Sequence, residues 1–395
     1  MLRAGVGHSI ALNPRTAARE ATAQALTAAG LSQASGALVF ATTAYGAAYA
    51  MILREVGATA KTREVAGCSS VGVIACEHEI ESGPALAVMV FGGADLVAQR
   101  CFAPQLRGRA DEVAAEVAHA VRPALGKSNL LLVFPDSYNA NPGALVAALA
   151  RELPEVAVCG GGASEDGSVG ETFQFCGDVV ANNSVSGMLL AGDFDLKIVA
   201  SNACTPIGAP HRVTAARDNV ILTLDDRPAY EVFAAAAGSL AKDLRRALAF
   251  VFLAIKLDYA TGEFSRGGYL VRNIIGASEE HGVIAVAHTP RVGEMVALAL
   301  RDADRARADL KATLEETLAQ TRAAGAAAPA FGLYFDCVSR GAGLYNIPGH
   351  DAAYIRRYLG NFPLAGFFTG FEIGPAGATT AALQYSGVLA IVSPK

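Results

Sequence analysis

Residues 330–375 read AFGLYFDCVSRGAGLYNIPGHDAAYIRRYLGNFPLAGFFTGFEIGP, and the rest of the chain is best interpreted outward from this stretch. It contains two apolar runs, Phe331–Phe335 and Phe362–Phe368, with a short charged helix expected between them. Runs of this length, bounded by glycine, are typical of buried strands. A loop with one charge follows each run: Arg340 after the first and Glu372 after the second. If the two strands are neighbours, these charges lie at one edge of a sheet, where small-molecule sites collect.

The same stretch carries the pattern Cys-x-x-Arg-Gly, followed after the helix by Pro-x-x-Gly-Phe-Phe-x-x-x-Glu-Ile-Gly-Pro. This pattern resembles the C-terminal signature of FIST domains, a family of small-ligand sensory modules in bacterial signalling. The usual form ends in Gly-Glu-Ile-Gly-Pro. Here Phe371 replaces the first glycine and leaves Glu372 in register.

The first half of the chain shows one order of elements twice: helix, strand, helix, strand, small-residue loop and further strands. The loop of the first copy is Gly-Cys-Ser-Ser-x-Gly-Val-Ile at residues 67–74, and that of the second is Gly-Gly-Gly-Ala-Ser at residues 160–164. We interpret this as an internal duplication. Both loops resemble segments of the FIST N-terminal domain, although Val73 stands where the family has a glutamate.

The predicted fold class is α/β, with two domains whose mixed sheets are covered by helices. We place the FIST N-terminal domain at residues 1–224 and the FIST C-terminal domain at residues 225–395. The boundary falls at Asp225-Asp226-Arg227-Pro228, and one helix over residues 229–247 is expected to follow it.

Composition excludes several classes of protein. The chain has 395 residues, 52% of them hydrophobic and 17% charged, which indicates a globular protein with a large core. A net charge of −5 argues against nucleic acid as the main partner. No run is long enough to span a membrane, and no signal peptide is visible, so we expect a cytoplasmic location. The seven cysteines form no C-x-x-C pair, which argues against a zinc ribbon.

The two loop charges suggest the class of ligand. Arginine binds a carboxylate by two parallel hydrogen bonds and glutamate binds an ammonium group, so Arg340 and Glu372 together would suit an amino acid. The FIST resemblance implies the same ligand class. Gly341 and Phe368 adjoin these loops, and Arg272 is a third candidate cation. The competing interpretation is that Arg340 and Glu372 pair with each other and only fix the loops.

The small-residue loops are the second candidate region. Ser69, Ser70, Gly161 and Gly162 follow predicted strands and would wall a pocket that needs small residues. The structural alternative is that these loops are tight turns where strands pack closely. Phosphate or dinucleotide binding is disfavoured, because the chain has neither G-x-G-x-x-G spacing here nor a P-loop lysine.

An enzyme is the third hypothesis. Cys337 lies three residues before Arg340, which would lower its thiol pKa, and His350 is the nearest base in sequence. Ser69 is a second candidate nucleophile. The alternative is a buried, inert thiol, which is the more common state of a lone cysteine.

Haem is the remaining cofactor hypothesis, since the resemblance also implies haem-based nitric oxide sensors. Haem needs one axial side chain and an apolar cleft, and His350 and His211, beside proline and glycine, are the candidates.

The sequence therefore favours a small-ligand sensory protein over an enzyme, and leaves the haem sensor and the Cys337 enzyme as alternatives. It carries no visible kinase or DNA-binding module, so its signal would pass to a separate partner such as a histidine kinase.

Overall fold

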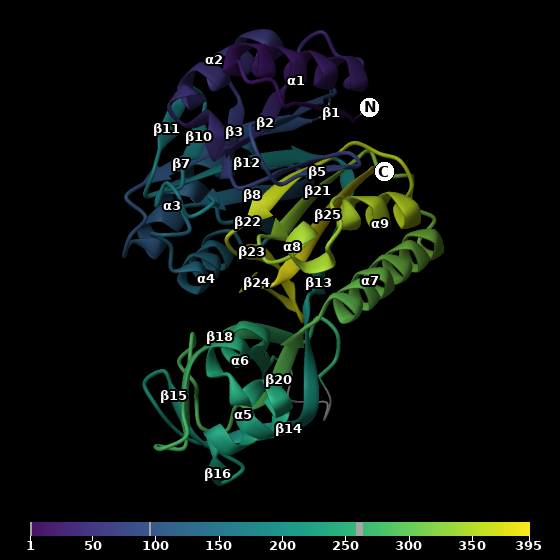
Figure 1. Cartoon of the computed structure of the whole chain (residues 1–395). Coiled ribbons are helices and arrows are strands. Elements are labelled where there is room, and N and C mark those ends of the chain that lie inside the picture. The colour runs from purple at the N-terminus through teal and green to yellow at the C-terminus, as the bar shows by residue number, and fades with distance from the viewer. Residues whose placement is uncertain (1, 95, 258–263) are drawn as a thin grey trace.

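The computed structural model describes residues 2–94, 96–257 and 264–395. Three mixed sheets surround a common core in a large body, and a smaller barrel is attached below it by two chain crossings (Figure 1). The predicted α/β class with mixed sheets and covering helices is confirmed. No helix of the described residues is long and apolar enough to cross a membrane.

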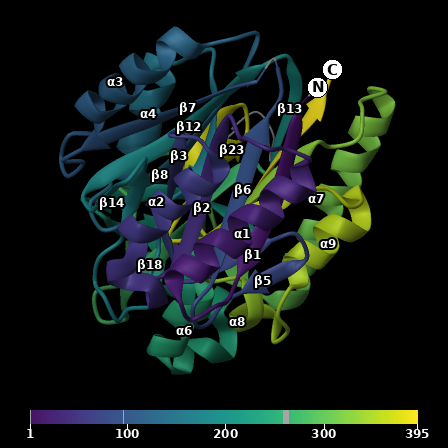
Figure 2. The same cartoon turned by 90° about the horizontal axis from the view of Figure 1, so that it is seen from above.

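The first unit of the large body alternates strands with two helices. Asn13 accepts a hydrogen bond from the backbone N–H of Thr16, Pro14 opens the first helix, and Gly30 ends it, as the sequence predicts. The elements are β1 (Arg3–Ser9), α1 (Pro14–Ala29), β2 (Gly36–Thr42), the 3₁₀ turn η1 (Thr43–Ala48), α2 (Tyr49–Ala60), β3 (Val65–Ser70), β4 (Val73–Ala75), β5 (His78–Ile80) and β6 (Leu86–Gly92). Figure 2 shows α1 and α2 lying across the strands of this unit.

The second unit repeats this order, which confirms the internal duplication. Its second helix again starts with Asn-Pro, and the side chain of Asn141 accepts from the backbone N–H of Ala144. The elements are β7 (Val97–Pro104), α3 (Ala110–Val121), η2 (Arg122–Ala124), β8 (Ser128–Pro135), α4 (Pro142–Glu152), β9 (Ala157–Gly161), β10 (Gln174–Cys176), β11 (Val179–Ala181) and β12 (Ser184–Gly192).

A third copy of the same unit, which the sequence analysis did not find, forms the C-terminal part of the large body. Its elements are β13 (Phe194–Asn202), α7 (Ala303–Ala323), β21 (Phe331–Cys337), α8 (Gly341–Tyr345), α9 (His350–Leu359), β22 (Leu364–Thr369), β23 (Glu372–Ala376), β24 (Thr379–Leu383) and β25 (Ser386–Pro394). The barrel interrupts this copy between β13 and α7, which hides the repeat in the sequence.

The barrel spans residues 204–301 and closes because β14 pairs with both β15 and β20. Its elements are β14 (Cys204–Arg217), β15 (Val220–Leu224), β16 (Arg227–Pro228), α5 (Ala229–Ala237), η3 (Gly238–Lys242), α6 (Leu244–Phe250), β17 (Val251–Lys256), β18 (Tyr269–Ser278), β19 (Val283–Val286) and β20 (Met295–Arg301). The single helix expected over residues 229–247 is wrong: Gly238 breaks it at φ 56°, and Asp243 caps a new helix. The expected domain boundary falls in the β15–β16 turn and stays a prediction.

The three sheets share one strand order. They read β1-β6-β2-β3-β10-β11, β7-β12-β8-β9-β23-β24 and β13-β25-β21-β22-β4-β5. In each sheet the second and third strands of the unit run parallel, and its last strand lies antiparallel between the first and second. The final two strands of each sheet come from the hairpin of another unit. The units therefore exchange hairpins in a closed cycle, which ties all three together.

A shared glycine and a shared phenylalanine mark the threefold arrangement. Gly67, Gly160 and Gly366 hold the same place in the third strand, where a Cβ would come within 2.1 Å of a carbonyl oxygen on the neighbouring strand. One phenylalanine of each second strand points into the central core. These are Phe40, Phe134 and Phe335, and Phe40 and Phe134 meet edge-on with ring centroids 5.4 Å apart.

Several local predictions need correction. Strand β1 was not expected, because its residues carry little apolar alternation and its partner β6 lies about 80 residues later. The sequence pattern also predicts one strand over residues 171–180, and this prediction is wrong, since residues 174–181 form the β10–β11 hairpin. The expected loop at Gly67 is also wrong, because β3 continues to Ser70 and its main chain pairs with β10. Glu372 starts strand β23 instead of lying in a loop.

Candidate functional site

The third strands of the three units end at one place, and this brings together small-residue segments far apart in the sequence. The Ser70 hydroxyl lies 2.9 Å from the carbonyl oxygen of Phe368 and 3.3 Å from the Ser164 hydroxyl. Ser164 also donates to the Phe368 carbonyl and accepts from the backbone N–H of Val71. All these side chains are buried. The structure thus places Ser70 and Phe368 together, with Ser164 as the member that the sequence analysis missed.

Ser69 has a structural partner of its own. Its hydroxyl accepts a 2.9 Å hydrogen bond from the backbone N–H of Phe173, the residue that leads into β10. It is fully buried, and its hydroxyl lies 3.5 Å from the carbonyl of Ser164. Ser69 therefore holds the exchanged hairpin of the second unit against β3.

Gly161 and Gly162 lie against the segment that leads into β23. The backbone N–H of Gly162 donates to the carbonyl of Phe371 at 2.8 Å, and Gly370 donates back to Gly162 at 2.9 Å. A Cβ on Gly162 would come 2.5 Å from the Phe371 ring. The small residue thus makes room for the phenylalanine that replaces the family's glycine, and Phe371 joins the core of the second unit.

Glu372 lies beside these glycines, and protein groups supply the hydrogen bonds to its carboxylate. Its carboxylate accepts hydrogen bonds from the Thr369 hydroxyl at 2.6 Å and from both the backbone N–H and the hydroxyl of Ser386. It is fully buried, and burial raises its pKa to about 7 in spite of these donors. No hydrogen bond or ion pair between Glu372 and Arg340 is found among the described residues.

Cys337 neighbours Glu372 and is 4% exposed. Burial first, and the Glu372 charge second, raise the pKa of its thiol well above the ordinary value. Such a thiol stays protonated and is a poor nucleophile. His350 turns to other partners, described below, so this geometry gives the thiol no support as a catalytic group.

Arg340 forms the centre of a second, fully buried cluster. Its Nη2 donates to Asp351 Oδ2 at 2.7 Å and to the Tyr345 hydroxyl at 2.9 Å, and its Nε lies 2.8 Å from Asp336 Oδ1. Arg340 is 1% exposed, and Asp336 and Asp351 are 0% exposed. The local sequence explains this, because β21 ends at Cys337 and Gly341, at φ 56°, turns the chain directly into α8.

Two glutamates reach this cluster from the hairpin that the first unit contributes. Glu79 accepts from the backbone N–H of Ala352 in the first turn of α9, and Glu81 accepts from the backbone N–H of Ala342 in α8. A carboxylate at a helix N-terminus satisfies free N–H groups and suits the helix dipole. The hairpin exchange therefore brings residues about 260 positions apart into one charged group.

The carboxyls of this cluster divide into charged and protonated groups. Asp351 accepts from Tyr334, Arg340 and His350, and these partners outweigh its burial and hold its pKa below the ordinary value. Burial, with the Asp351 charge added, raises the pKa of Glu79 to about 8 and that of Asp336 well above its ordinary value. We assign the negative charge to Asp351, because only it has a full set of donors.

Unsatisfied polar atoms concentrate here. Among the described residues, four side chains of the cluster bury atoms without a partner: Asp336 (Oδ2, since Oδ1 lies against Arg340 Nε), Glu79 (Oε2), Arg340 (Nη1) and His350 (Nε2). Folded proteins rarely leave buried polar atoms unpaired, so such a group calls for a functional explanation. The cluster therefore contains an unpaired donor on a cationic side chain, Arg340, together with unpaired acceptors on carboxyl groups.

The two histidines proposed for haem do not fit it. His350 donates through Nδ1 to the Asp351 carboxylate and stacks between Tyr345 and Tyr354, with ring centroids 3.8 Å and 4.5 Å away. His211 lies on the barrel, where its Nδ1 is 2.7 Å from Asp225. Within the described residues, neither ring lines the cavities of about 380, 490, 660 and 710 Å³, so the structure gives haem binding at these histidines no support. No group of three or more metal-binding side chains occurs in the described ranges.

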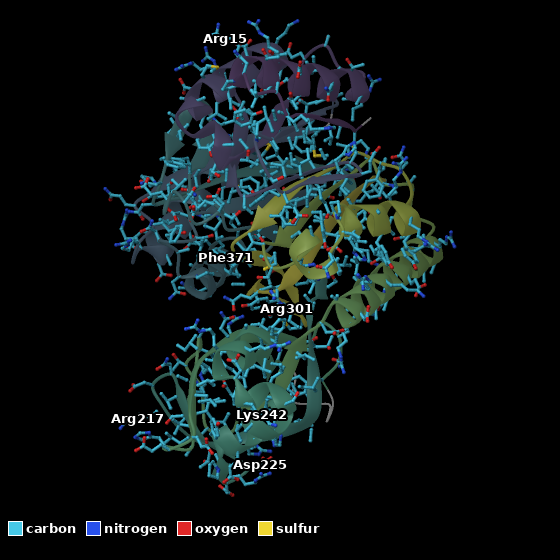
Figure 3. The ribbon with its side chains drawn as sticks, viewed as in Figure 1. Arg15, Arg217, Asp225, Lys242, Arg301 and Phe371 are labelled. Carbon is cyan, nitrogen blue, oxygen red and sulfur yellow. The ribbon has the colours of Figure 1, made fainter. Side chains whose placement is uncertain are left out.

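Arg272 lies apart from both clusters. It is on β18 of the barrel, and its Nη2 donates to the carbonyl of Ala382 at 3.2 Å, which links the barrel to β24. Burial lowers its pKa. Figure 3 shows Arg301 at the same junction, with Phe371 above it in the large body.

Four cavities in the described part of the chain, of about 380, 490, 660 and 710 Å³, have room for a small molecule, and none of the ten predicted ligand-binding residues lines them. One, of about 710 Å³, lies between the two ends of the chain and includes Leu2, Lys127 and Lys395. Another, of about 660 Å³, lies beside α2. Among the residues that the analysis missed, Asp336 had a visible signal, since it is a charge at the end of an apolar run. Glu79 had none, because only the hairpin exchange brings it to Arg340.

Comparison with known proteins covers nearly the whole chain. Residues 36–227 match the family model described as the FIST N domain, and residues 229–375 match the FIST C domain. An uncharacterised protein of Mycobacterium tuberculosis strain H37Rv is 29% identical over 398 residues, which covers 99% of each chain. An uncharacterised protein of Mycobacterium bovis is 30% identical over 393 residues, covering 99% of this chain and 98% of that one.

Among the solved structures that the chain resembles is that of a cyanuric acid hydrolase from A. caulinodans. It covers 100% of this chain and 99% of its own, with a TM-score of 0.39 and 12% identity. A likeness at this level supports no statement about activity.

Proposed function

The chain belongs to the FIST family, and on that premise we propose that it is a sensory protein whose ligand is a small zwitterion, an amino acid or a related metabolite. FIST domains are associated with sensory signal transduction and ligand binding. The ligand is received in the cluster around Arg340, and the signal passes to a separate partner protein. The observation that carries this proposal is the set of buried, unpaired atoms of opposite charge character.

The unpaired atoms complement the two ends of an amino acid. The free Nη1 of Arg340 is the donor for a carboxylate. Asp336 Oδ2 and Glu79 Oε2 are the acceptors for an ammonium group. Glu372, which the sequence assigned to the ammonium group, already has three donors, so Asp336 takes that place in the proposal.

The cluster is closed, so the ligand enters by displacing α8. This helix has five residues and is bounded by left-handed residues, Gly341 and Asn346. Tyr345 of α8 also contacts α7, since Arg307 donates to its carbonyl at 3.2 Å. Because α7 begins two residues after the last strand of the barrel, movement of α8 would be transmitted toward the barrel. A sensor requires such a change in shape on binding.

A thermal-shift and calorimetric screen with the free amino acids tests this proposal. A ligand at 100 times its Kd stabilises the chain by about 2.7 kcal/mol, which raises Tm by a few degrees. Asp336→Asn is expected to abolish the shift while the protein stays folded, because an amide replaces a carboxyl that is already protonated. Glu372→Gln, a matched change of another buried carboxyl, is expected to keep it.

Proton release gives a second readout. An ammonium group binds the ionised forms of Asp336 and Glu79, so binding releases protons and affinity rises with pH until Glu79 titrates near pH 8. Calorimetry in two buffers of different ionisation enthalpy measures this release. The proposal fails if no amino acid raises Tm, or if Glu372→Gln abolishes binding as Asp336→Asn does.

A further inference from the structure

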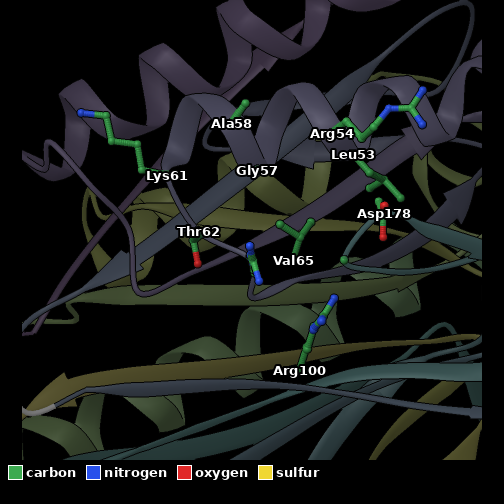
Figure 4. Close-up of a pocket in the computed structure, with 11 residues that line it drawn as sticks. Leu53, Arg54, Gly57, Ala58, Lys61, Thr62, Val65, Arg100 and Asp178 are labelled. Atoms are coloured by element: carbon green, nitrogen blue, oxygen red, sulfur yellow. The ribbon is translucent and has the colours of Figure 1, made fainter.

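The cavity beside α2 is separate from the Arg340 cluster and has a distinct character. It measures about 660 Å³ and lies between the C-terminal half of α2, the segment that leads into β3, and the turn of the β10–β11 hairpin. Figure 4 shows Lys61 and Arg54 extending in opposite directions from α2, Arg100 on the strand below them, and Val65 in between. Small-molecule sites in proteins have volumes of roughly 300–1,000 Å³, so this space suits a metabolite.

The charge of the lining is opposite to that of the whole chain. Arg54, Lys61, Arg63 and Arg100 line the cavity together with one acid, Asp178, so its net charge is four minus one, or +3. The chain as a whole carries −5. A cation at a helix C-terminus is common, and this accounts for Lys61, the C-cap residue of α2. It does not account for the arginines on β7 and before β3.

Three of these cations have no counter-ion. Within the described ranges, Arg54, Lys61 and Arg63 make no ion pair and no side-chain hydrogen bond. Nearby Glu55 is engaged with Arg15 and Arg19. Like charges gathered around a cavity repel one another, and a bound anion would relieve that repulsion.

Arg100, the fourth cation of the lining, is held in place by its own main chain and by the hairpin turn at Gly177. Glu64 accepts from its backbone N–H at 2.8 Å, and the nearest carboxylate oxygen lies 4.0 Å from its Nε, so the guanidinium is only weakly paired. Gly177, at φ 64°, lets the guanidinium lie across the hairpin turn: a Cβ there would come 1.7 Å from Nη1. The turn thus holds one guanidinium in place at the cavity while its side chain stays 35% exposed.

We propose that this cavity binds a small phosphorylated metabolite. Guanidinium groups recognise phosphate by paired hydrogen bonds, and a lysine adds a mobile point charge. Three unpaired cations favour a group with more than one negative charge over a single carboxylate. The proposal is independent of the zwitterion site, because no residue is shared between the two.

Isothermal titration of the full chain with inorganic pyrophosphate tests the proposal. We expect saturable binding to one site, at least tenfold weaker in the double variant Arg63→Gln/Arg100→Gln. The matched control is Arg217→Gln, an exposed arginine on the barrel (Figure 3), which should bind as the wild type does. Asp336→Asn should also bind pyrophosphate normally, so failure at one site is distinguishable from failure at the other.

Three outcomes overturn the proposal. The first is absence of pyrophosphate binding at low ionic strength. The second is an equal loss in Arg217→Gln, which would indicate general attraction to surface charge. The third is tight binding of a single-stranded oligonucleotide that pyrophosphate does not displace, which would make the cavity part of a nucleic-acid surface. Arg63→Lys/Arg100→Lys sharpens the result, because it keeps the charge but removes the planar fork and should weaken binding only in part.

Discussion

Two clefts occupy equivalent places in the first and third units, one beside the end of α2 and the other beside the end of α9. In both, the turn of an exchanged hairpin donates a backbone hydrogen bond to the start of the third strand: Gly177 to Val65 at 2.8 Å and Cys76 to Leu364 at 2.7 Å. Both turn residues are left-handed, at φ 64° and 54°. The backbone frame is therefore the same, yet the cavity volumes are about 660 Å³ and 10 Å³.

Two equivalent positions account for much of the difference. Lys61 and Arg63 of the first unit correspond to Gly360 and Phe362 of the third. Phe362 packs into the core over Gly332, where a Cβ would come 2.7 Å from its ring. The third unit thus fills its cleft with the Phe362 ring, whereas the first unit leaves its cleft open and lines it with exposed charged side chains. The comparison teaches that a repeat can be reused for packing in one copy and for recognition in another.

The largest expected effect comes from removing the ring. Phe362→Ala should lower the free energy of unfolding by about 3–5 kcal/mol, since it empties a buried site over a glycine. The equivalent change in the open cleft, Arg63→Ala, should cost less than about 0.5 kcal/mol, because the side chain is exposed. Denaturant titration of both variants measures the contrast. Similar losses would show that the two clefts are not packed differently.

The second effect is on the pH dependence of stability, because several buried carboxyls gather beside α9. Burial raises the pKa of Glu79 to about 8, so between pH 5 and 8 the folded chain holds a proton that the unfolded chain has lost. The free energy of unfolding should therefore fall as pH rises through this range, and Glu79 alone contributes at most ~1.4 kcal/mol per pH unit to that slope. Glu79→Gln should flatten that slope, and Glu112→Gln, exposed on α3, should not. An unchanged slope in Glu79→Gln would place the proton elsewhere.

A third effect concerns the hairpin turns. Gly177→Ala should cost about 1 kcal/mol, because alanine is strained at φ 64°. It should also weaken pyrophosphate binding, since the new Cβ displaces the Arg100 guanidinium. Cys76→Ala is the matched control, because cysteine already carries a Cβ at φ 54°. Equal pyrophosphate affinity in Gly177→Ala and the wild type would contradict the role given to Arg100.

The smallest effect is expected at the rim of the closed cleft. Arg356 pairs with Glu77 at 3.3 Å, but both side chains are about half exposed. Arg356→Gln should therefore change the free energy of unfolding by less than about 0.5 kcal/mol. A loss above 2 kcal/mol, measured by the same denaturant titration, would mean that this ion pair, and not Phe362, closes the cleft.

The sequence by itself determined the features that depend on neighbouring residues. The Asn-Pro starts of α1 and α4, the end of α1 at Gly30, and the apolar runs of β8, β21 and β22 were all readable, because caps and buried strands are local patterns. The order of small-residue segments also revealed two of the three units and the family.

Only the tertiary structure decided which segments meet. The closed exchange of hairpins brings Glu79 to Arg340 and Ser164 to Ser70, and it leaves Glu372 with Ser386 instead of with Arg340. The third unit was hidden because the barrel separates β13 from α7. Pairing between distant strands is set by the packing of whole sheets around one core. No spacing along the chain encodes it, and so neither the buried charges nor the open cationic cleft could be predicted from the residues alone.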